Sequence, residues 1–426
     1  MEKWKMIMMV AVFAVWISAA AYAGDSANGA ARNDAGNCLC ADGSADVDNC
    51  MGTMEGDCAI VDADCARRDG SVDVGGSTAS LRGIRRQELF AVDRTDTARA
   101  VSCYRIPAIT TAPDGSLIAA IDERVPSCGD LKWSRDINIV MRRSTDGGRT
   151  WSPIRKVVDF PDGQSASDPS LITDTVSGTV FLFYNYMDHD AAKDVYFFHV
   201  MRSTDNGRTW SAPEDITSQV APEDWRSDFK FLTSGQGTAT RDGRLLHTMV
   251  NLQKGLHLIE STDHGLTWHL LLVPIVPADE SKVIELPDGR WMVNSRVNEG
   301  GCRYIHISDD KGRSWTSNPA PGLPDPGCNG AIVNYPQYGE GGCLLFVNTA
   351  DPEQRCKLTL RYSLNGGITW SDGLILVDGD AGYSDVTVLH SGEIAVFYER
   401  DGYVSAEVAV VSPESLFGVG RCRSEE

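Results

Sequence analysis

The chain has 426 residues, of which 42% are hydrophobic, and this content supports a large folded core. Its 59 acidic residues outnumber its 39 Lys and Arg residues, so the formal net charge is −20 at pH 7. This balance argues against nucleic acid or an anionic membrane as a partner, although a few arginines in one cleft can still bind an anionic substrate, since salt screens charges beyond about 10 Å.

Residues 1–23 have the pattern of an export signal. Lys3 and Lys5 precede an apolar run, and Ala21–Ala23 forms a small-x-small cleavage site. The alternative is an uncleaved membrane anchor, but the run is short for a span of about 20 residues. We therefore expect a secreted, periplasmic or cell-surface protein with no membrane span in the mature chain.

Residues 24–84 are rich in Gly, Asp, Ala, Ser and Cys and show little apolar periodicity. Five of the chain's cysteines lie here, at positions 38, 40, 50, 58 and 65. We interpret the segment as a linker or a small disulfide-stapled unit, as is common in exported proteins. A metal site is the alternative, but the cluster contains neither a CxxC pair nor a histidine.

Residues 85–426 change in character. Short β-rich runs such as "SLIAAIDER", "TVFLFYNYM" and "EIAVFYERD" alternate with turn signals. No segment keeps a helical period over more than two turns. Short strands at regular spacing predict an all-β sandwich, barrel or propeller.

A repeated turn decides between these three folds. The pattern Ser-x-Asp-x-Gly-x-Thr-Trp occurs in five related copies, which end at Trp151, Trp210, Trp268, Trp315 and Trp370. Their spacing of roughly 47 to 59 residues is the length of one four-stranded blade. We therefore predict a six-bladed β-propeller of antiparallel blades, in which the sixth blade lacks the motif and pairs strands from both ends of the domain.

The repeated turn has a local structural logic. Its Asp carboxylate can accept backbone N–H groups, its Gly can adopt a positive φ, and its Trp can pack between sheets. Asn365 replaces Asp in the fifth copy, where an amide oxygen can still accept. We assign Asp146 and its counterparts a structural role, on the face away from the functional site.

The "YRIP" stretch at Tyr104–Pro107, followed by the five turns, resembles the bacterial and trypanosomal sialidases (exo-neuraminidases). The resemblance covers nearly all of the chain after about residue 85. It implies a glycoside hydrolase that removes terminal sialic acids from glycoconjugates, without a metal or another cofactor. We expect a monomer.

In this family three arginines bind the carboxylate of sialic acid. The resemblance places them at Arg105, Arg296 and Arg355. A guanidinium group suits this task because it is always charged and binds a carboxylate with two parallel hydrogen bonds.

The resemblance also implies the reacting groups. Asp130 matches the acid that protonates the leaving oxygen, with Asp136 as the alternative, and Arg124 matches an arginine that lines the pocket. Tyr383 in "GYSD" matches the nucleophile, and Glu280 matches its base. A neutral phenol suits an anomeric carbon that bears a carboxylate, because an anionic nucleophile would be repelled. Glu285 lies at an odd offset from Glu280 and should face away.

Two further residues match supporting positions. Glu399 in "VFYER" matches the glutamate that orients the first arginine, and Asp168 matches an aspartate near the acylamino and ring-hydroxyl side of the substrate. Asp168 can alternatively be a simple turn residue before Pro169. Cys103 and Cys128 flank neighbouring antiparallel strands, so we predict a disulfide between them.

Three questions stay open from the sequence. The segment "SGQGTA" departs from the usual family pattern beside the N-acyl group, so the substrate is N-acetylneuraminic acid or a deaminated analogue. A trans-sialidase of the same fold is an alternative to a hydrolase. A non-catalytic propeller of the same turns, acting as a binding module, is the other alternative.

Overall fold

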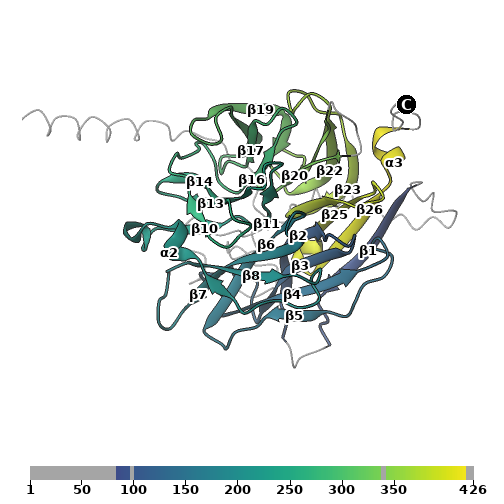
Figure 1. Ribbon diagram of the computed structural model, residues 1–426. Helices are drawn as coiled ribbons and strands as arrows, with labels where there is room; N and C mark the ends of the chain where they lie inside the picture. The colour runs from purple at the N-terminus through teal and green to yellow at the C-terminus, as the bar shows by residue number, and fades with distance from the viewer. Residues whose placement is uncertain (1–82, 96–99, 337–341, 419–426) are drawn as a thin grey trace, which may run out of the picture. The chain divides into compact units, whose positions relative to one another are not determined.

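Six sheets surround one central axis in the computed structural model, which describes residues 83–95, 100–336 and 342–418 (Figure 1). The predicted signal peptide at residues 1–23 and nearly all of the cysteine-rich segment at 24–84 lie outside the described residues. The six sheets confirm the predicted six-bladed propeller.

The blades follow one another in chain order. The first blade contains β2 (Cys103–Thr111), β3 (Leu117–Val125), β4 (Asp136–Ser144) and β5 (Arg155–Val158). The second contains β6 (Gln164–Asp174), β7 (Thr179–Asp188), β8 (Phe197–Ser203), β9 (Glu214–Asp215) and the short β11 (Gly235–Gln236). The third contains β10 (Lys230–Leu232), β12 (Thr238–Ala239), β13 (Leu245–Asn251), β14 (Gly255–Ser261) and β15 (His269–Leu270).

The other three blades have four strands each. The fourth contains β16 (Ser281–Glu285), β17 (Trp291–Ser295), β18 (Gly301–Ser308) and β19 (Thr316–Asp325). The fifth contains β20 (Ala331–Asn334), β21 (Leu344–Thr349), β22 (Cys356–Ser363) and β23 (Leu374–Asp380). The sixth contains β24 (Ser384–Val388), β25 (Ile394–Arg400), β26 (Ser405–Val411) and β1 (Ile84–Ala91).

Two blades differ from the four-stranded expectation. The second and third sheets each have a fifth strand, and the extra strand of the second blade, β11, runs parallel to β6. Both extra strands are only two residues long and come from the "SGQGTA" segment. This segment therefore bridges the second and third blades near the axis, where Figure 1 places β11.

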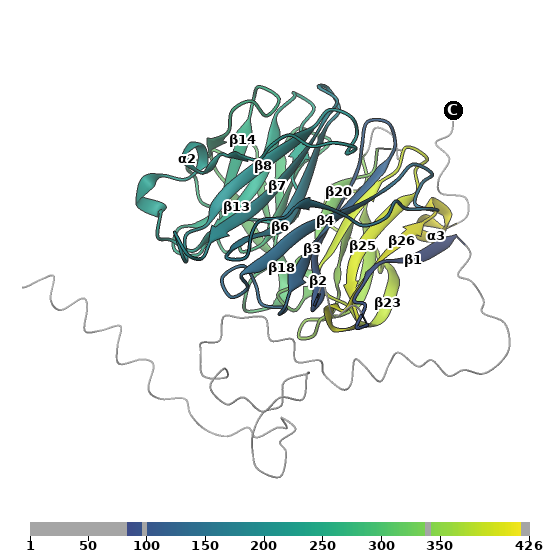
Figure 2. The same ribbon diagram turned by 90° about the horizontal axis from the view of Figure 1, so that it is seen from below.

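The sixth blade closes the ring, as predicted. Its outermost strand, β1, precedes the first blade in the chain and pairs antiparallel with β26, with Ile84 opposite Val411 and Ala91 opposite Ser405. This closure joins the two ends of the propeller, because a strand that precedes the first blade in the chain completes the sheet of the last blade. Figure 2 shows β1 beside β26 and β25.

The blades pack face to face, so most strands are buried on both sides. For example, eight of the nine residues of β3 are buried, including both faces of its apolar start "LIAAI". Continuous apolar runs are typical of strands covered on two faces. The clusters of the core join neighbouring blades, such as Ile109 and Ala119 of the first blade with Phe397 and Val408 of the sixth.

The repeated turn forms the hairpin between the third and fourth strands of each of the first five blades. In the first copy, the Asp146 carboxylate accepts the backbone N–H groups of Arg149 at 3.0 Å and Thr150 at 2.9 Å. The Thr150 hydroxyl also donates to it at 2.6 Å, and this bond contributes most to a pKa of Asp146 below its usual range. In the fifth copy, the Asn365 Oδ1 accepts the Thr369 N–H at 2.9 Å, as expected for an amide.

These turns lie at the end of the blade opposite the candidate site. Leu117 of β3 pairs with Ser144, which begins the first turn, whereas Val125 at the other end of β3 pairs with Asp136. Arg105 pairs with Asp122 near that second end. The structural role assigned to Asp146 therefore agrees with its position.

Helices are short in the described part of the chain. They comprise α2 (Thr217–Val220), α3 (Pro413–Phe417) and the 3-10 turns η2 (Glu223–Trp225) and η4 (Asp401–Tyr403). Among the described residues, no helix has the length and apolar character needed to cross a membrane.

The turn glycines give a test of blade packing. Gly265 has a φ of +78°, and a Cβ there would lie 2.3 Å from the Phe181 ring of the neighbouring blade. Gly366 in the fifth turn has a φ of +68°, and no other atom of the described residues lies within 4 Å of its Cβ position. We expect Gly366→Ala to cost about 1 kcal/mol from backbone strain, and Gly265→Ala to cost about 2 kcal/mol more from the clash. Urea unfolding measures both, and equal losses would contradict this packing.

Candidate active site

Six predicted residues from four blades meet at one end of the propeller. Arg105 lies in β2, Glu280 and Tyr383 directly precede β16 and β24, and Arg355 directly precedes β22. Asp130 follows β3, and Arg296 follows β17. Odd strands of a blade start, and even strands finish, at this same end, because neighbouring strands are antiparallel. The topology therefore gathers residues that are far apart in sequence.

Tyr383 and Glu280 form the central contact. The Tyr383 hydroxyl donates to Glu280 Oε2 at 2.6 Å. Both residues are only 4% exposed. The Arg296 Nη1 lies 2.8 Å from the same carboxylate oxygen and donates to the Tyr383 hydroxyl at 2.9 Å. The phenol therefore lies between a base that can take its proton and a cation that stabilises a negative oxygen.

Burial raises the pKa of the Glu280 carboxyl above its ordinary value, while the Arg296 guanidinium opposes the shift. A carboxylate with a raised pKa is a stronger base toward a phenol than an exposed glutamate. The arrangement suits a base that must accept a proton from a hydroxyl group.

Three arginines surround the Tyr383 ring. The guanidinium carbons of Arg105, Arg296 and Arg355 lie 5.3, 6.0 and 5.3 Å from its centroid. Arg296 and Arg355 also donate to the same carbonyl, that of Gly327, at 3.1 and 3.4 Å. Three cations at this spacing can bind one carboxylate above the tyrosine.

Glu399 holds the first arginine and the tyrosine together. Its Oε1 lies 3.4 Å from Arg105 Nε and accepts the Ile106 N–H at 2.7 Å, while its Oε2 accepts the Tyr383 N–H at 2.7 Å. A Cβ on Gly382 would lie 2.2 Å from Glu399 Oε2, so this contact requires glycine before the tyrosine. Glu399 thus does more than orient Arg105, because it also ties β2 to the strand that follows Tyr383.

The backbone is strained at two inner strands. Ile106 and Asp168 have φ values of +66° and +61°, and each precedes a proline at a register shift of its strand. Such conformations are costly for residues other than glycine and concentrate at functional sites. At Ile106 the unusual geometry turns the N–H toward Glu399.

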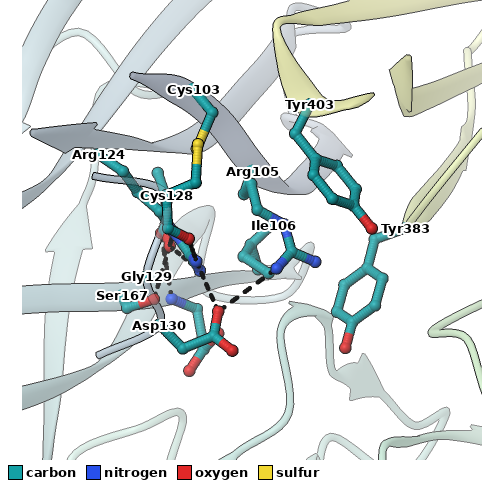
Figure 3. A network of polar contacts seen from close by, with 12 residues as sticks. Cys103, Arg105, Ile106, Arg124, Cys128, Gly129, Asp130, Ser167, Tyr383 and Tyr403 are labelled. Atoms are coloured by element: carbon teal, nitrogen blue, oxygen red, sulfur yellow. Dashed lines mark hydrogen bonds and ion pairs between the residues drawn. A yellow bond between two sulfur atoms is a disulfide. The ribbon is translucent and has the colours of Figure 1, made fainter. Parts of the chain in front are cut away.

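Asp130 lies on the opposite side of Arg105 from Tyr383, as Figure 3 shows. Its Oδ1 accepts from Arg124 Nη1 at 2.5 Å and from Arg105 Nη1 at 3.4 Å. Its side chain is 42% exposed, in contrast to the buried base. An exposed carboxyl held by arginines can reach a leaving group at the mouth of the site.

The predicted disulfide anchors the Asp130 loop. Cys103 and Cys128 are bonded, with their Cα atoms 5.7 Å apart, and the Cys128 carbonyl accepts from Arg124 at 2.9 Å (Figure 3). Asp136, the alternative acid, begins β4 and accepts from the side chain of Asn138 instead. Glu285, which was expected to face away from Glu280, pairs with Arg241 at 3.1 Å.

Asp168 joins the site through Asp122, a residue that the sequence did not point to. The Asp168 N–H donates to Asp122 Oδ1 at 3.2 Å, and Asp122 Oδ2 lies 3.1 Å from Arg124 Nη2. Burial raises the pKa of Asp122 to about 6. Burial and the nearby carboxyls of Asp122 and Glu280 raise the pKa of Asp168 to about 8. The Asp168 side chain also accepts from Asn185 Nδ2 at 2.9 Å, so both its backbone and its side chain contact neighbours at the site.

Tyr403 is a second residue that sequence reasoning missed. The Arg105 guanidinium lies 4.2 Å from its ring centroid, and its hydroxyl accepts from Arg355 Nη1 at 3.1 Å. It therefore links two of the three arginines. The only signal in the sequence is its place four residues after Glu399, in a segment that the η4 turn brings back to the site.

All nine predicted site residues belong to one chain of contacts. It runs from Asp168 through Asp122, Arg124 and Asp130 to Arg105, then through Glu399, Tyr383 and Glu280 to Arg296, and through the Gly327 carbonyl to Arg355. The described residues contain no group of three His, Cys, Asp or Glu side chains arranged to hold a metal ion.

Comparison with known proteins identifies the family. A family described as "BNR repeat-like domain" matches residues 115–396. A sialidase from Micromonospora viridifaciens is 36% identical over 329 residues, which cover 70% of this chain and 50% of that protein. A sialidase from Bacteroides fragilis is 29% identical over 335 residues, which cover 70% of this chain and 60% of that protein. The chain thus spans between 50% and 60% of the length of these curated relatives.

Solved structures agree with this result. The Hadza microbial sialidase Hz136 superposes with a TM-score of 0.67 at 30% identity, over 74% of this chain and 67% of that one. The intramolecular trans-sialidase from Ruminococcus gnavus superposes with a TM-score of 0.66 at 18% identity, over 80% of this chain and 99% of that one, which shows a shared fold. The chain therefore belongs to the BNR repeat-like domain family, in its sialidase group.

Proposed function

We propose that the protein is a retaining exo-α-sialidase that hydrolyses terminal sialic acids from glycoconjugates. The observation that carries the proposal is the 2.6 Å hydrogen bond from the Tyr383 hydroxyl to the buried Glu280 carboxylate, within reach of three arginines. A non-catalytic propeller that only binds a carboxylate would require the three arginines and no other residue of this group. It gives no reason for a tyrosine paired with a buried base.

The three arginines bind the substrate carboxylate. The guanidinium groups of Arg105, Arg296 and Arg355 lie within 6.0 Å of the Tyr383 ring centroid, so a carboxylate bound to them places the adjacent anomeric carbon near the phenol. Binding energy from these charged hydrogen bonds is used to orient the reacting atoms.

Tyr383 is the nucleophile in this mechanism. Glu280 takes the phenol proton as the Tyr383 oxygen forms a bond to the anomeric carbon, and the bond to the leaving oxygen breaks. Arg296, which contacts both groups, stabilises the negative charge that develops on the phenol oxygen. A neutral nucleophile avoids the repulsion that a carboxylate would meet at a carbon bearing a carboxylate.

Asp130 is the acid and then the base. It gives its proton to the departing glycosidic oxygen, and in the second step it takes a proton from the water that attacks the sialyl-tyrosine. Glu280 returns its proton to the Tyr383 oxygen as that bond breaks. Two displacements at the same carbon retain its configuration.

Hydrolysis is favoured over transfer in this proposal because Asp130, 42% exposed, lies where water has access. Transfer is the alternative, since a sugar hydroxyl can replace water in the second step. Product analysis with added lactose separates the two, because a trans-sialidase forms sialyllactose and a hydrolase forms free sialic acid.

We also propose export of the protein. The Cys103–Cys128 disulfide lies within the propeller, and disulfides persist mainly in oxidising compartments. The predicted signal peptide at residues 1–23 is the segment that would direct the chain to the export machinery.

The first functional prediction concerns the nucleophile. We expect Tyr383→Phe to lower kcat on sialyllactose by at least about a hundredfold, because no covalent intermediate can form. A 3-fluorosialyl fluoride should label the wild type at Tyr383 and leave the variant unlabelled, as mass spectrometry of peptides will show.

Tyr362→Phe is the matched control, because Tyr362 lies in β22 of the fifth blade, where it packs against Phe417 of α3, away from the site. If Tyr383→Phe turned over substrate as fast as the wild type, the assignment of Tyr383 as the nucleophile would be wrong. If the wild type showed no turnover at any pH, the proposed sialidase activity would be wrong.

The second functional prediction concerns the acid. We expect Asp130→Asn to lose about a thousandfold in kcat/KM on sialyllactose but less than about tenfold on a 4-nitrophenyl sialoside, because nitrophenolate leaves without a proton. Steady-state kinetics on the two substrates measures the difference. Asp136→Asn should behave as wild type, and the opposite result for the two variants would move the acid to Asp136.

A further inference from the structure

A second layer of polar residues lies directly behind the Tyr383–Glu280 pair. Lys282 comes two residues after Glu280 on β16, and Asp385 comes two residues after Tyr383 on β24. Because side chains alternate along a strand, each residue faces the same side as its catalytic neighbour. Both are fully buried, Lys282 at 1% and Asp385 at 0% exposure.

Lys282 is held by an amide from the next blade. Its Nζ donates to Asn329 Oδ1 at 2.8 Å, and the Asn329 amide donates to Ser234 Oγ at 2.8 Å. Asp385 Oδ2 accepts the Ile109 N–H of β2 at 2.8 Å. The layer therefore ties together segments from several blades around the axis.

Gly235 makes room for this layer. It has a φ of +90°, and a Cβ on it would lie 3.0 Å from Lys282 Cε and 3.4 Å from Asp385 Cγ. Lys282 of the fourth blade and Asp385 of the sixth blade thus both lie close to Gly235. Gly235 belongs to the "SGQGTA" segment, whose departure from the family pattern the proposed mechanism did not explain.

The charges of the layer act on each other and on the base. Burial lowers the pKa of Lys282 to about 8 and raises the pKa of Asp385 to about 7, while each residue favours the charged form of the other. The Ile109 N–H and, after it, the Lys282 charge favour the ionised form of Asp385 against the effect of burial.

Glu280 is surrounded by groups of both signs. Arg296 and Lys282 lower the pKa of Glu280 and Asp279 raises it, while the Tyr383 hydroxyl bond also lowers it. The Asp168 carboxyl interacts with Glu280 from the side of the second blade. Lys282 thus opposes the effect of burial on the base, as a smaller contribution than that of Arg296.

We propose that Lys282 is a positioning residue whose buried charge, on the same face as Glu280, keeps this base ionised for proton transfer from Tyr383. The inference rests on the proposed sialidase function. A purely structural role explains the charges less well, because buried charges of opposite sign often stabilise a fold no more than well-packed apolar residues of similar size. Because Lys282 follows Glu280 on the same face, its positive charge favours the ionised form of the Glu280 carboxyl.

The test is Lys282→Gln, which removes the charge but keeps a donor for Asn329. The pKa of Glu280 should rise, so the acid limb of the kcat/KM profile should move up by about one pH unit. Binding of a dehydrated sialic acid analogue should stay within about twofold, because the three arginines are intact. Lys230→Gln is the control, since Lys230 is equally buried at 1% but lies in β10 of the third blade.

The double variant Lys282→Gln/Asp385→Asn guards against misfolding, because it leaves no unbalanced buried charge. We expect the same shift of its acid limb as in the single variant. An active protein whose pH profile stays at the wild-type position in the variants, or moves equally in Lys230→Gln, would overturn the role of Lys282 alone. A wild type without sialidase turnover would overturn the proposed function and this inference together.

Discussion

The pairing of β1 with β26 is the constraint on which the rest of the structure depends. It makes the first and sixth blades neighbours, although they lie at opposite ends of the domain in sequence. Only then can Glu399 of the sixth blade accept from Ile106 of the first blade and from the Tyr383 backbone. The ring also buries both faces of its blades, which places the site's charges in a region of weak solvent screening.

That burial explains how an acidic protein can offer an anion-binding site. The net charge is −20, yet three arginines surround the Tyr383 ring at one end of the axis. Carboxylates hold two of them in place: Glu399 and Asp130 contact Arg105, and Glu280 contacts Arg296. Distant surface charges are screened by salt, so the local cations decide what the site attracts. The same carboxylates orient the guanidinium groups for a bound substrate.

Much of this arrangement could be predicted, and the failures have physical causes. The repeated turn is local, because Asp146 bonds to residues three and four positions away, so its five copies marked five of the six blades and their spacing. The extra strands β11 and β12 were missed because two residues are too short for a periodic pattern. Asp122 and Tyr403 were missed because no local pattern distinguishes a buried carboxyl or a tyrosine that stacks on an arginine, and the place of Tyr403 four residues after Glu399 is a weak signal.

The sequence determined what depends on neighbouring residues: the turns, the blade repeat, and the residue types that a resemblance could match, such as Tyr383 and Glu280. The tertiary structure decided what depends on the whole ring. It set the 2.6 Å contact between two residues 103 positions apart, the shared hold of Glu399 on two strands, and the placement of Lys282 behind the base. Burial and pKa shifts follow from the surrounding blades, and no short stretch of sequence contains that information.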